Sequence, residues 1–136
     1  MTSYLLESDV ERACDSLIEK HGGRVVRLSQ GRATRQTEGI ADREYFVLGY
    51  SIRYEVKKLD GKLSAAQADM LREIYNAGGV ASCGGVDELA HLLVALRHSK
   101  EHGRSLAWLF VGLWAARGLR KEKKAAREKR LQASNY

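Results

Sequence analysis

Three side chains that could take part in catalysis, Asp42, Glu55 and Lys57, are expected to lie close together around one strand-like run. Ile52-Arg-Tyr-Glu-Val-Lys-Lys places Glu55 and Lys57 on one face of a strand, and Asp42 enters the preceding strand of a predicted hairpin. Two carboxylates and a backbone carbonyl form the hard-oxygen set that Mg²⁺ or Mn²⁺ prefers. A lysine beside them can orient a water at the metal or stabilise charge that develops on a phosphate. A cross-strand ion pair on an exposed sheet face explains the same residues without chemistry.

Gln67 is a polar amide on the apolar side of a predicted helix, in line with Leu71 and Ile74. A buried amide needs hydrogen-bond partners. Ser64-x-x-Gln67 fits a capping box, in which the glutamine returns to the backbone of the N-cap residue. The alternative places the amide beside the metal and its waters. The sequence leaves both open.

The elements that must position these residues predict an α/β domain over about residues 4–102. Apolar spacing predicts helices over 5–21, over 64–77 and from Asp87 onward, and strands over 24–28, 44–48, 51–58 and 80–83. Gly49 separates the second and third strands as a hairpin, and the polar run 29–41 is a loop. The predicted order is α-β-β-β-α-β-α.

Composition excludes several other classes of protein. With 136 residues, 44% hydrophobic and 29% charged, the chain suits one globular domain. Two cysteines, Cys14 and Cys83, make neither a disulfide framework nor a zinc motif. The acidic N-terminus lacks signal-peptide features, and no apolar run is long enough for a membrane span. We expect no membrane association and a cytoplasmic location in a bacterial or phage-infected cell.

The net charge of +6 is concentrated near the C-terminus. Residues 117–131 contain eight bases and two acids, so the rest of the chain is neutral. Such a run is typical of a polyanion-binding segment, and equally of a solvated helix end.

The segment just before it, Leu106–Ala116, is apolar nearly all round and includes Trp108, Phe110, Leu113 and Trp114. A helix of this kind must be buried on every side. It predicts a homodimer interface through 106–116 or packing across the chain's own core. Residues 103–136 are expected to be a helical extension rather than an independent domain.

Taken together, the motifs resemble the VRR-NUC (virus-type replication-repair nuclease) domain of the PD-(D/E)xK superfamily over about residues 4–96. The matching pieces, in order, are Gly39, Asp42, Glu55-Val56-Lys57, Leu63-Ser64-Ala65-Ala66-Gln67, Gly78-Gly79 and Val86-Asp87-Glu88-Leu89. The resemblance implies a restriction-endonuclease-like core with a C-terminal helical extension. Ala41 stands where the family has proline, which loosens the approach to Asp42 without removing a ligand.

The resemblance also implies roles for single residues. Asp42 and Glu55 would bind Mg²⁺ or Mn²⁺ with the Val56 carbonyl, Lys57 would serve the attacking water, and Gln67 would complete the site. The family places a further glutamate in the first helix. On a helical wheel Glu7 lies nearer the apolar stripe than Glu11, at roughly 70° against roughly 110°. A glutamate there also compensates the helix dipole without any catalytic role.

The activity implied is that of a metal-dependent deoxyribonuclease that cuts branched DNA, such as a Holliday junction, in replication, repair or recombination. The alternative is a catalytically silent DNA-binding or assembly protein of the same fold. The basic residues predicted to contact DNA are Arg32, Arg35, Lys58, Arg120, Lys121, Lys124 and Arg127.

Overall fold

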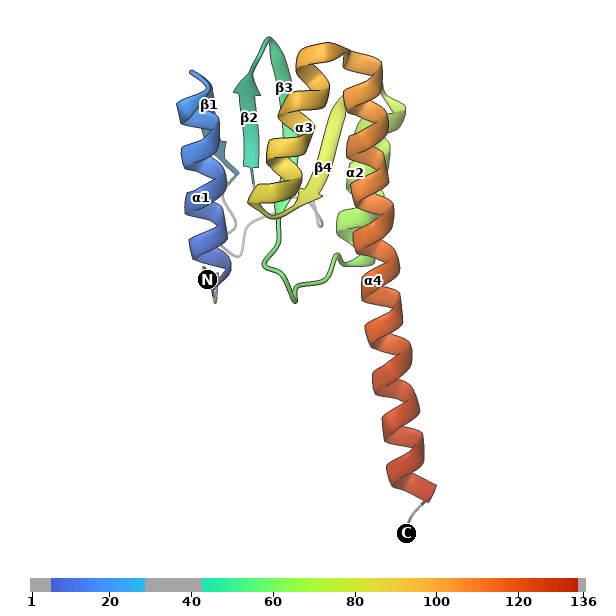
Figure 1. Cartoon of the computed structure of the whole chain (residues 1–136). Coiled ribbons are helices and arrows are strands. Elements are labelled where there is room, and N and C mark those ends of the chain that lie inside the picture. Colours follow the sequence, from blue (N-terminus) through green and yellow to red (C-terminus); the bar gives the residue numbers. More distant parts are fainter. Residues whose placement is uncertain (1–5, 29–42, 135–136) are drawn as a thin grey trace.

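The computed structural model describes residues 6–28 and 43–134 (Figure 1). Its elements are α1 (Glu7–Lys20), β1 (Arg24–Arg27), β2 (Arg43–Val47), β3 (Tyr50–Val56), α2 (Ala65–Asn76), β4 (Val80–Gly84), α3 (Val86–His98) and α4 (Lys100–Ser134). The order confirms the predicted α-β-β-β-α-β-α core, followed by one long helix. The third helix begins two residues earlier than expected from an N-cap at Asp87. Its N-cap is Gly85, whose backbone N–H donates to the Glu88 carboxylate at 2.8 Å.

The four strands form one mixed sheet in the order β1-β2-β3-β4. β1, β2 and β3 are antiparallel, whereas β3 and β4 are parallel and are connected through α2. A two-residue turn, Leu48 and Gly49, joins β2 to β3, and both residues have positive φ, as a type I′ hairpin turn requires. At the other end of β3, Val56 pairs with Gly84, so β3 and β4 end at the same edge of the sheet.

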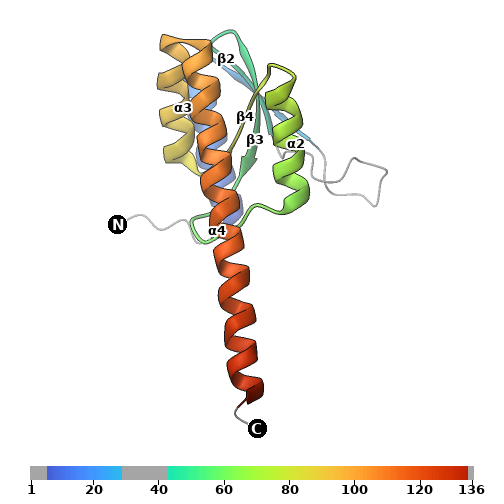
Figure 2. The same ribbon diagram turned by 90° about the vertical axis from the view of Figure 1, so that its right-hand side faces the viewer.

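Helices cover both faces of the sheet and one of its edges. α1 and α3 pack on one face, over Ile52, Tyr54 and Val56. α2 packs on the other face, where Leu71 joins Ala81, Cys83 and residues of α4 in a second core cluster. Figure 2 shows α4 running along the β4 edge, with α3 to one side and α2 to the other. This helix therefore protects a sheet edge that would otherwise offer its backbone to another strand.

The first half of α4 belongs to the body of the protein. Gly103 admits α3 at close range, since a Cβ there would lie 2.3 Å from a methyl group of Leu96. Trp114 is buried in the second core cluster, and Trp108 stacks on Tyr75 of α2 with ring centroids 5.0 Å apart. The two tryptophans predicted for a subunit interface thus pack within the chain, which was the other alternative for this segment. No helix in the described part of the chain is long and apolar enough to cross a membrane.

Candidate active site

Glu55 is a buried carboxylate near the end of β3. Its neighbours Tyr54 and Val56 enter the core under α1 and α3, whereas the Glu55 side chain meets α2 on the opposite face, as strand alternation predicts. The residue is only 2% exposed. A buried carboxylate is costly unless it is hydrogen-bonded or paired with a cation. Its partners therefore show what the site is built to hold.

Gln67 on the first turn of α2 supplies a hydrogen bond to this carboxylate. Its amide Nε2 donates to Glu55 Oε1 at 2.7 Å. Its Oε1 accepts from the Ser64 backbone N–H at 3.0 Å, and the Ser64 hydroxyl accepts from the Gln67 backbone, so the capping box is complete. Because the cap occupies the amide oxygen, the amide nitrogen must face Glu55. The two alternatives for Gln67 thus combine, and the helix cap orients the glutamine toward the carboxylate.

Lys57 follows β3 directly and lies on the same side as Glu55. Its Nζ is 3.5 Å from Glu55 Oε1, and its side chain is 11% exposed. The Lys57 backbone N–H donates to the Gly84 carbonyl at 2.9 Å and extends the β3–β4 ladder by one residue. The backbone of Lys57 is therefore fixed beside Glu55, and its ammonium lies next to the Glu55 carboxylate.

Cys83 pairs with Glu55 across β3 and β4 and reports the local electrostatics. Burial raises the pKa of the Cys83 thiol well above its ordinary value; the Glu55 carboxylate raises it further, and Lys57 opposes them. The thiol is therefore neutral at ordinary pH, and only a thiolate is a good metal ligand or nucleophile. The chemistry available at this point is that of oxygen donors and a lysine.

The structure describes only some of the other predicted site residues. Asp42, Arg32 and Arg35 lie outside the described residues. Val56, whose carbonyl was predicted as a ligand, is the last residue of β3. Glu7 is the partly exposed first residue of α1, on the other face of the sheet from Gln67. α1 begins at the lower edge in Figure 1, the edge at which β3 and β4 end.

The predicted DNA-binding residues within the described part of the chain are all on the surface. Lys58 follows Lys57 and lies 3.6 Å from the Asp60 carboxylate. Arg120, Lys121, Lys124 and Arg127 are exposed on the second half of α4. The structure brings Glu55, Lys57 and Gln67 into one cluster, which we call the Glu55 site, and leaves these cations around it.

The donors of the Glu55 site fit a hard divalent cation. Within residues 6–28 and 43–134 no three His, Cys, Asp or Glu side chains form a metal-binding group. A carboxylate next to a strand-terminal carbonyl is nevertheless the oxygen chemistry that Mg²⁺ and Mn²⁺ select, and no thiolate or imidazole competes. The donors therefore suit either ion as part of a larger set.

A second buried ionic cluster, which the sequence did not predict, links α1 to β2. Arg43 Nε donates to Asp15 at 3.1 Å, and Arg43 Nη2 donates to Glu11 at 3.2 Å. Tyr45 donates its hydroxyl to Asp15 at 2.9 Å, and Arg27 approaches the same carboxylate at 3.5 Å. The Asp15 carboxylate and its hydrogen bond to Arg43 outweigh the cost of burial and raise the pKa of Arg43. A signal was available, because Arg43, Tyr45 and Val47 alternate as one buried strand face.

A pocket of about 510 Å³ lies beside this second cluster, lined by Asp15, Glu19, Gly23, Arg24, Val25 and Arg27. It is next to β1, at the far edge of the sheet from β4, and none of the residues of the Glu55 site contributes to it. This pocket therefore does not coincide with the carboxylate, lysine and amide of the Glu55 site.

Comparison with known proteins places the fold. No protein-family model matches the sequence, and no curated protein matches it. Among solved structures, one described as "VRR_NUC domain" is similar at a TM-score of 0.53 and 24% sequence identity. The similarity covers 64% of this chain and 92% of that one. The predicted resemblance is thereby confirmed at the level of the fold: the chain has a VRR-NUC-like α/β fold with an additional C-terminal helix.

Proposed function

We propose that this protein is a metal-dependent DNA endonuclease that hydrolyses phosphodiester bonds at the Glu55 site. The observation that carries the proposal is the contact of Glu55 with both Gln67 and Lys57 at the end of β3. An amide fixed by a helix cap and a lysine whose backbone is bonded to the neighbouring strand both lie against one buried carboxylate. This is more preorganisation than a cross-strand ion pair needs, and it suits electrostatic catalysis.

Glu55 and the Val56 carbonyl are the proposed metal ligands from the described residues. Asp42 is proposed to complete the set from outside them, with Glu7 contributing from α1. A bound Mg²⁺ or Mn²⁺ supplies Lewis acidity and lowers the pKa of an attacking water. The protein supplies the geometry, because Glu55 is held in one rotamer by the Gln67 amide.

Lys57 and Gln67 have different proposed roles. The Lys57 ammonium orients the attacking water and stabilises negative charge that develops on the phosphate. Gln67 is a positioning residue that acts through Glu55, as a hydrogen-bonded neighbour of a metal ligand commonly does. Lys58 and the cations of α4 are proposed to contact the DNA backbone nearby.

Branched DNA is the proposed substrate, and a two-fold dimer is the proposed assembly. Branched DNA such as a Holliday junction offers two symmetric cleavage positions, and an isologous dimer supplies two sites with the same symmetry. The outward face of α4 supports this, because Leu109 and Leu113 are both 55% exposed. Light scattering tests it: Leu109→Asp with Leu113→Asp should yield monomers, whereas Leu119→Asp, on another face of α4, should not.

The alternative is a DNA-binding protein that has this fold and lacks catalysis. It accounts equally for Ala41 and for the basic helix. It gives no reason for Gln67 to be fixed on one side by the helix cap and on the other by a buried glutamate. The cytoplasmic location in a bacterial or phage-infected cell stays a prediction.

A cleavage panel tests the proposed function. Purified protein is incubated with a four-way junction, a flap and a linear duplex in Mg²⁺, Mn²⁺ or EDTA. We expect cutting of a branched substrate that EDTA and Lys57→Ala abolish, while Lys100→Ala, an exposed lysine at the opposite end of the molecule, cuts normally. Cutting that survives both Glu55→Ala and Lys57→Ala would come from another site or a contaminant and would contradict the proposal.

A further inference from the structure

The second half of α4 leaves the body of the protein next to the loop that follows Lys57. At Gly118 the helix comes so close that a Cβ would lie 3.4 Å from the Leu63 carbonyl oxygen. Beyond that point Lys121 donates to the Asp60 carbonyl, and Glu122 lies 3.5 Å from Lys62. Asp60, Lys62 and Leu63 belong to the segment that connects Lys57 to the N-cap of α2. The base of the projecting helix is therefore fixed relative to the Glu55 site.

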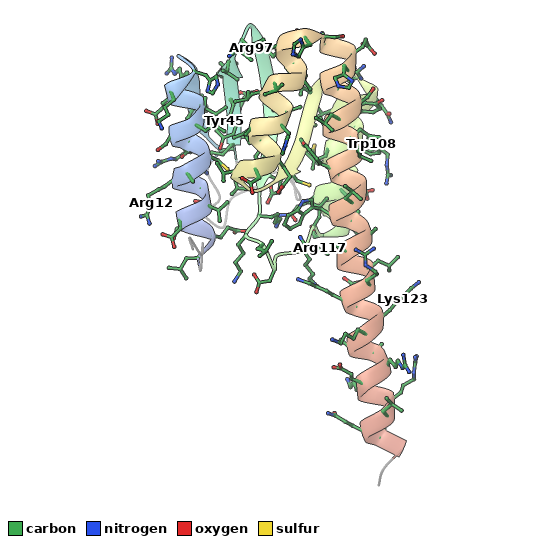
Figure 3. All side chains as sticks on the ribbon, in the orientation of Figure 1. Arg12, Tyr45, Arg97, Trp108, Arg117 and Lys123 are labelled. Atoms are coloured by element: carbon green, nitrogen blue, oxygen red, sulfur yellow. The ribbon has the colours of Figure 1, made fainter. Side chains whose placement is uncertain are left out.

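Past Gly118 the helix is solvated and strongly basic. Every side chain from Leu119 to Ala133 is exposed, and Figures 2 and 3 show this stretch, with Lys123, extending away from all other elements. At 100° per residue, five cations fall on one side of the helix. We call this side the basic face; its members are Arg120, Lys123, Lys124, Arg127 and Arg130.

The apolar residues of this stretch do not form a face of their own. Leu119, Ala126 and Ala133 follow one line at seven-residue spacing, but Glu122 and Lys129 lie between them on that side; Ala125 lies elsewhere, and Leu131 lies within the basic face. A helix that binds a membrane surface or a coiled-coil partner needs a continuous apolar stripe. A row of cations without such a stripe complements a regular row of phosphates.

We propose that residues 119–134 form an arm that holds a double-stranded flank of the substrate beside the Glu55 site. The proposal rests on the proposed function and specifies its substrate further. From Arg120 to Arg130 the basic face measures about 15 Å at 1.5 Å per residue. That length spans about four base pairs of B-DNA at 3.4 Å per pair. The preferred substrate therefore has a duplex of at least this length next to the position that is cut.

DNA binding in EDTA tests the arm without requiring catalysis. Fluorescence anisotropy of a labelled 20-base-pair duplex is measured against salt for three proteins: the wild type, an arm variant and a control variant. The arm variant carries Arg120→Gln, Lys124→Gln and Arg127→Gln. The control variant carries Lys20→Gln, Arg97→Gln and Lys100→Gln, which remove the same charge at the opposite end of the molecule (Figures 1 and 3).

We expect the arm variant to bind at least about tenfold more weakly and to lose about 2.7 from the log–log salt slope, at about 0.9 per phosphate contact. The control variant should keep the wild-type slope. Equal losses in both variants would mean that only net charge matters and would overturn the arm. The arm would also be overturned if the wild type bound a 20-nucleotide single strand as tightly as the duplex. The same holds if the arm variant lost binding to phosphatidylserine vesicles but still bound the duplex as tightly as the wild type. This assay measures binding and the cleavage panel measures cutting, so failure of the arm and failure of the proposed function are seen in different experiments.

Discussion

Two clusters of buried charge lie on opposite faces of the same sheet, and they are built differently. At Asp15, one carboxylate receives the guanidinium of Arg43, the hydroxyl of Tyr45 and a second guanidinium from Arg27. At Glu55, an amide donates one hydrogen bond and a lysine ammonium lies 3.5 Å away. Arginine binds a carboxylate through a rigid planar fork, whereas lysine is a compact charge on a flexible stem.

From this difference we infer that buried charge alone does not identify a functional site. The Asp15 cluster lies midway along α1 and ties that helix to β1 and β2. The Glu55 site lies where two parallel strands end, next to a backbone carbonyl, and the segment that follows Lys57 contacts the base of an exposed basic helix. Asp15 is thus paired with two full charges on rigid forks, whereas Glu55 accepts a hydrogen bond from an amide and has one ammonium nearby; on the proposed function, Glu55 is the carboxylate that binds the metal.

The largest expected effect is on DNA cleavage, when the central carboxylate of each cluster is replaced by the amide of the same shape. Glu55→Gln should lower DNA cleavage at least about a thousandfold, the scale of a lost electrostatic group in a preorganised site. Asp15→Asn should cut at the wild-type rate per folded molecule. Single-turnover cleavage of a branched substrate, normalised to the folded fraction from circular dichroism, makes the comparison. Equal losses in the two variants would remove the distinction between the clusters.

For the free energy of unfolding, we expect the reverse order: substitutions in the Asp15 cluster should cost more than those at the Glu55 site. Arg43→Met removes the buried guanidinium that Asp15 and Glu11 share and leaves Asp15 with only the exposed Arg27 as a charged partner. Breaking a buried ion pair typically costs about 3–5 kcal/mol. Glu55→Gln should change the free energy of unfolding much less. Urea denaturation measures both. If Arg43→Met combined with Asp15→Leu is no more stable than Arg43→Met alone, the cost does not arise from an uncompensated buried carboxylate.

A smaller effect separates the two functions of Gln67. Gln67→Glu can keep the capping box, since glutamate and glutamine both serve at that position, but it sets a second carboxylate against Glu55. We expect a loss of about 10- to 100-fold in cleavage, as for other residues that orient a metal ligand. Ser64→Ala is the matched control: it should cost about 1 kcal/mol of stability through the cap and leave the cleavage rate of the folded protein intact. Unchanged cleavage by Gln67→Glu would confine Gln67 to capping.

The smallest expected effect concerns the two thiols. Burial raises the pKa of Cys14 to about 12 from its ordinary value of 9.0, and neighbouring Asp15 adds to the shift. The folded protein thus keeps this proton when the unfolded chain releases it, so stability is unaffected below pH 8 and falls as the pH rises above about 9. At pH 8 an aromatic disulfide reagent should label neither Cys14 nor Cys83 until urea unfolds the protein. Rapid labelling of the native protein would contradict this and would show that the two core clusters that hold Cys14 and Cys83 unfold locally.

Much of the fold was predictable because its signals are local. Apolar spacing located the core helices, and the Leu48-Gly49 turn fixed the register that places Glu55 on the α2 face. The capping box was readable from Ser64 and Gln67. The contact between Gln67 and Glu55 was not, because it depends on how closely α2 packs against the end of β3, and no short-range pattern encodes that distance.

The Asp15 cluster and the path of α4 escaped prediction for a related reason. Asp15 looks like a polar residue beside an apolar helix stripe, and only pairing across 28 positions with Arg43 explains its burial. Trp108 and Trp114 looked too large for the core of a small domain. They fit because α4 covers the β4 edge and closes a second cluster against α2.

Calorimetric titration of Mn²⁺ into the DNA-free protein tests the central claim most directly. The claim is that the carboxylate of Glu55 belongs to a divalent-metal site, whereas that of Asp15 does not. We predict saturable heat from the wild type and from Asp15→Asn, and its loss in Glu55→Gln at an unchanged circular-dichroism spectrum. Saturable binding that persists in Glu55→Gln, or none in the wild type, would contradict the account and would favour a DNA-binding protein without catalysis.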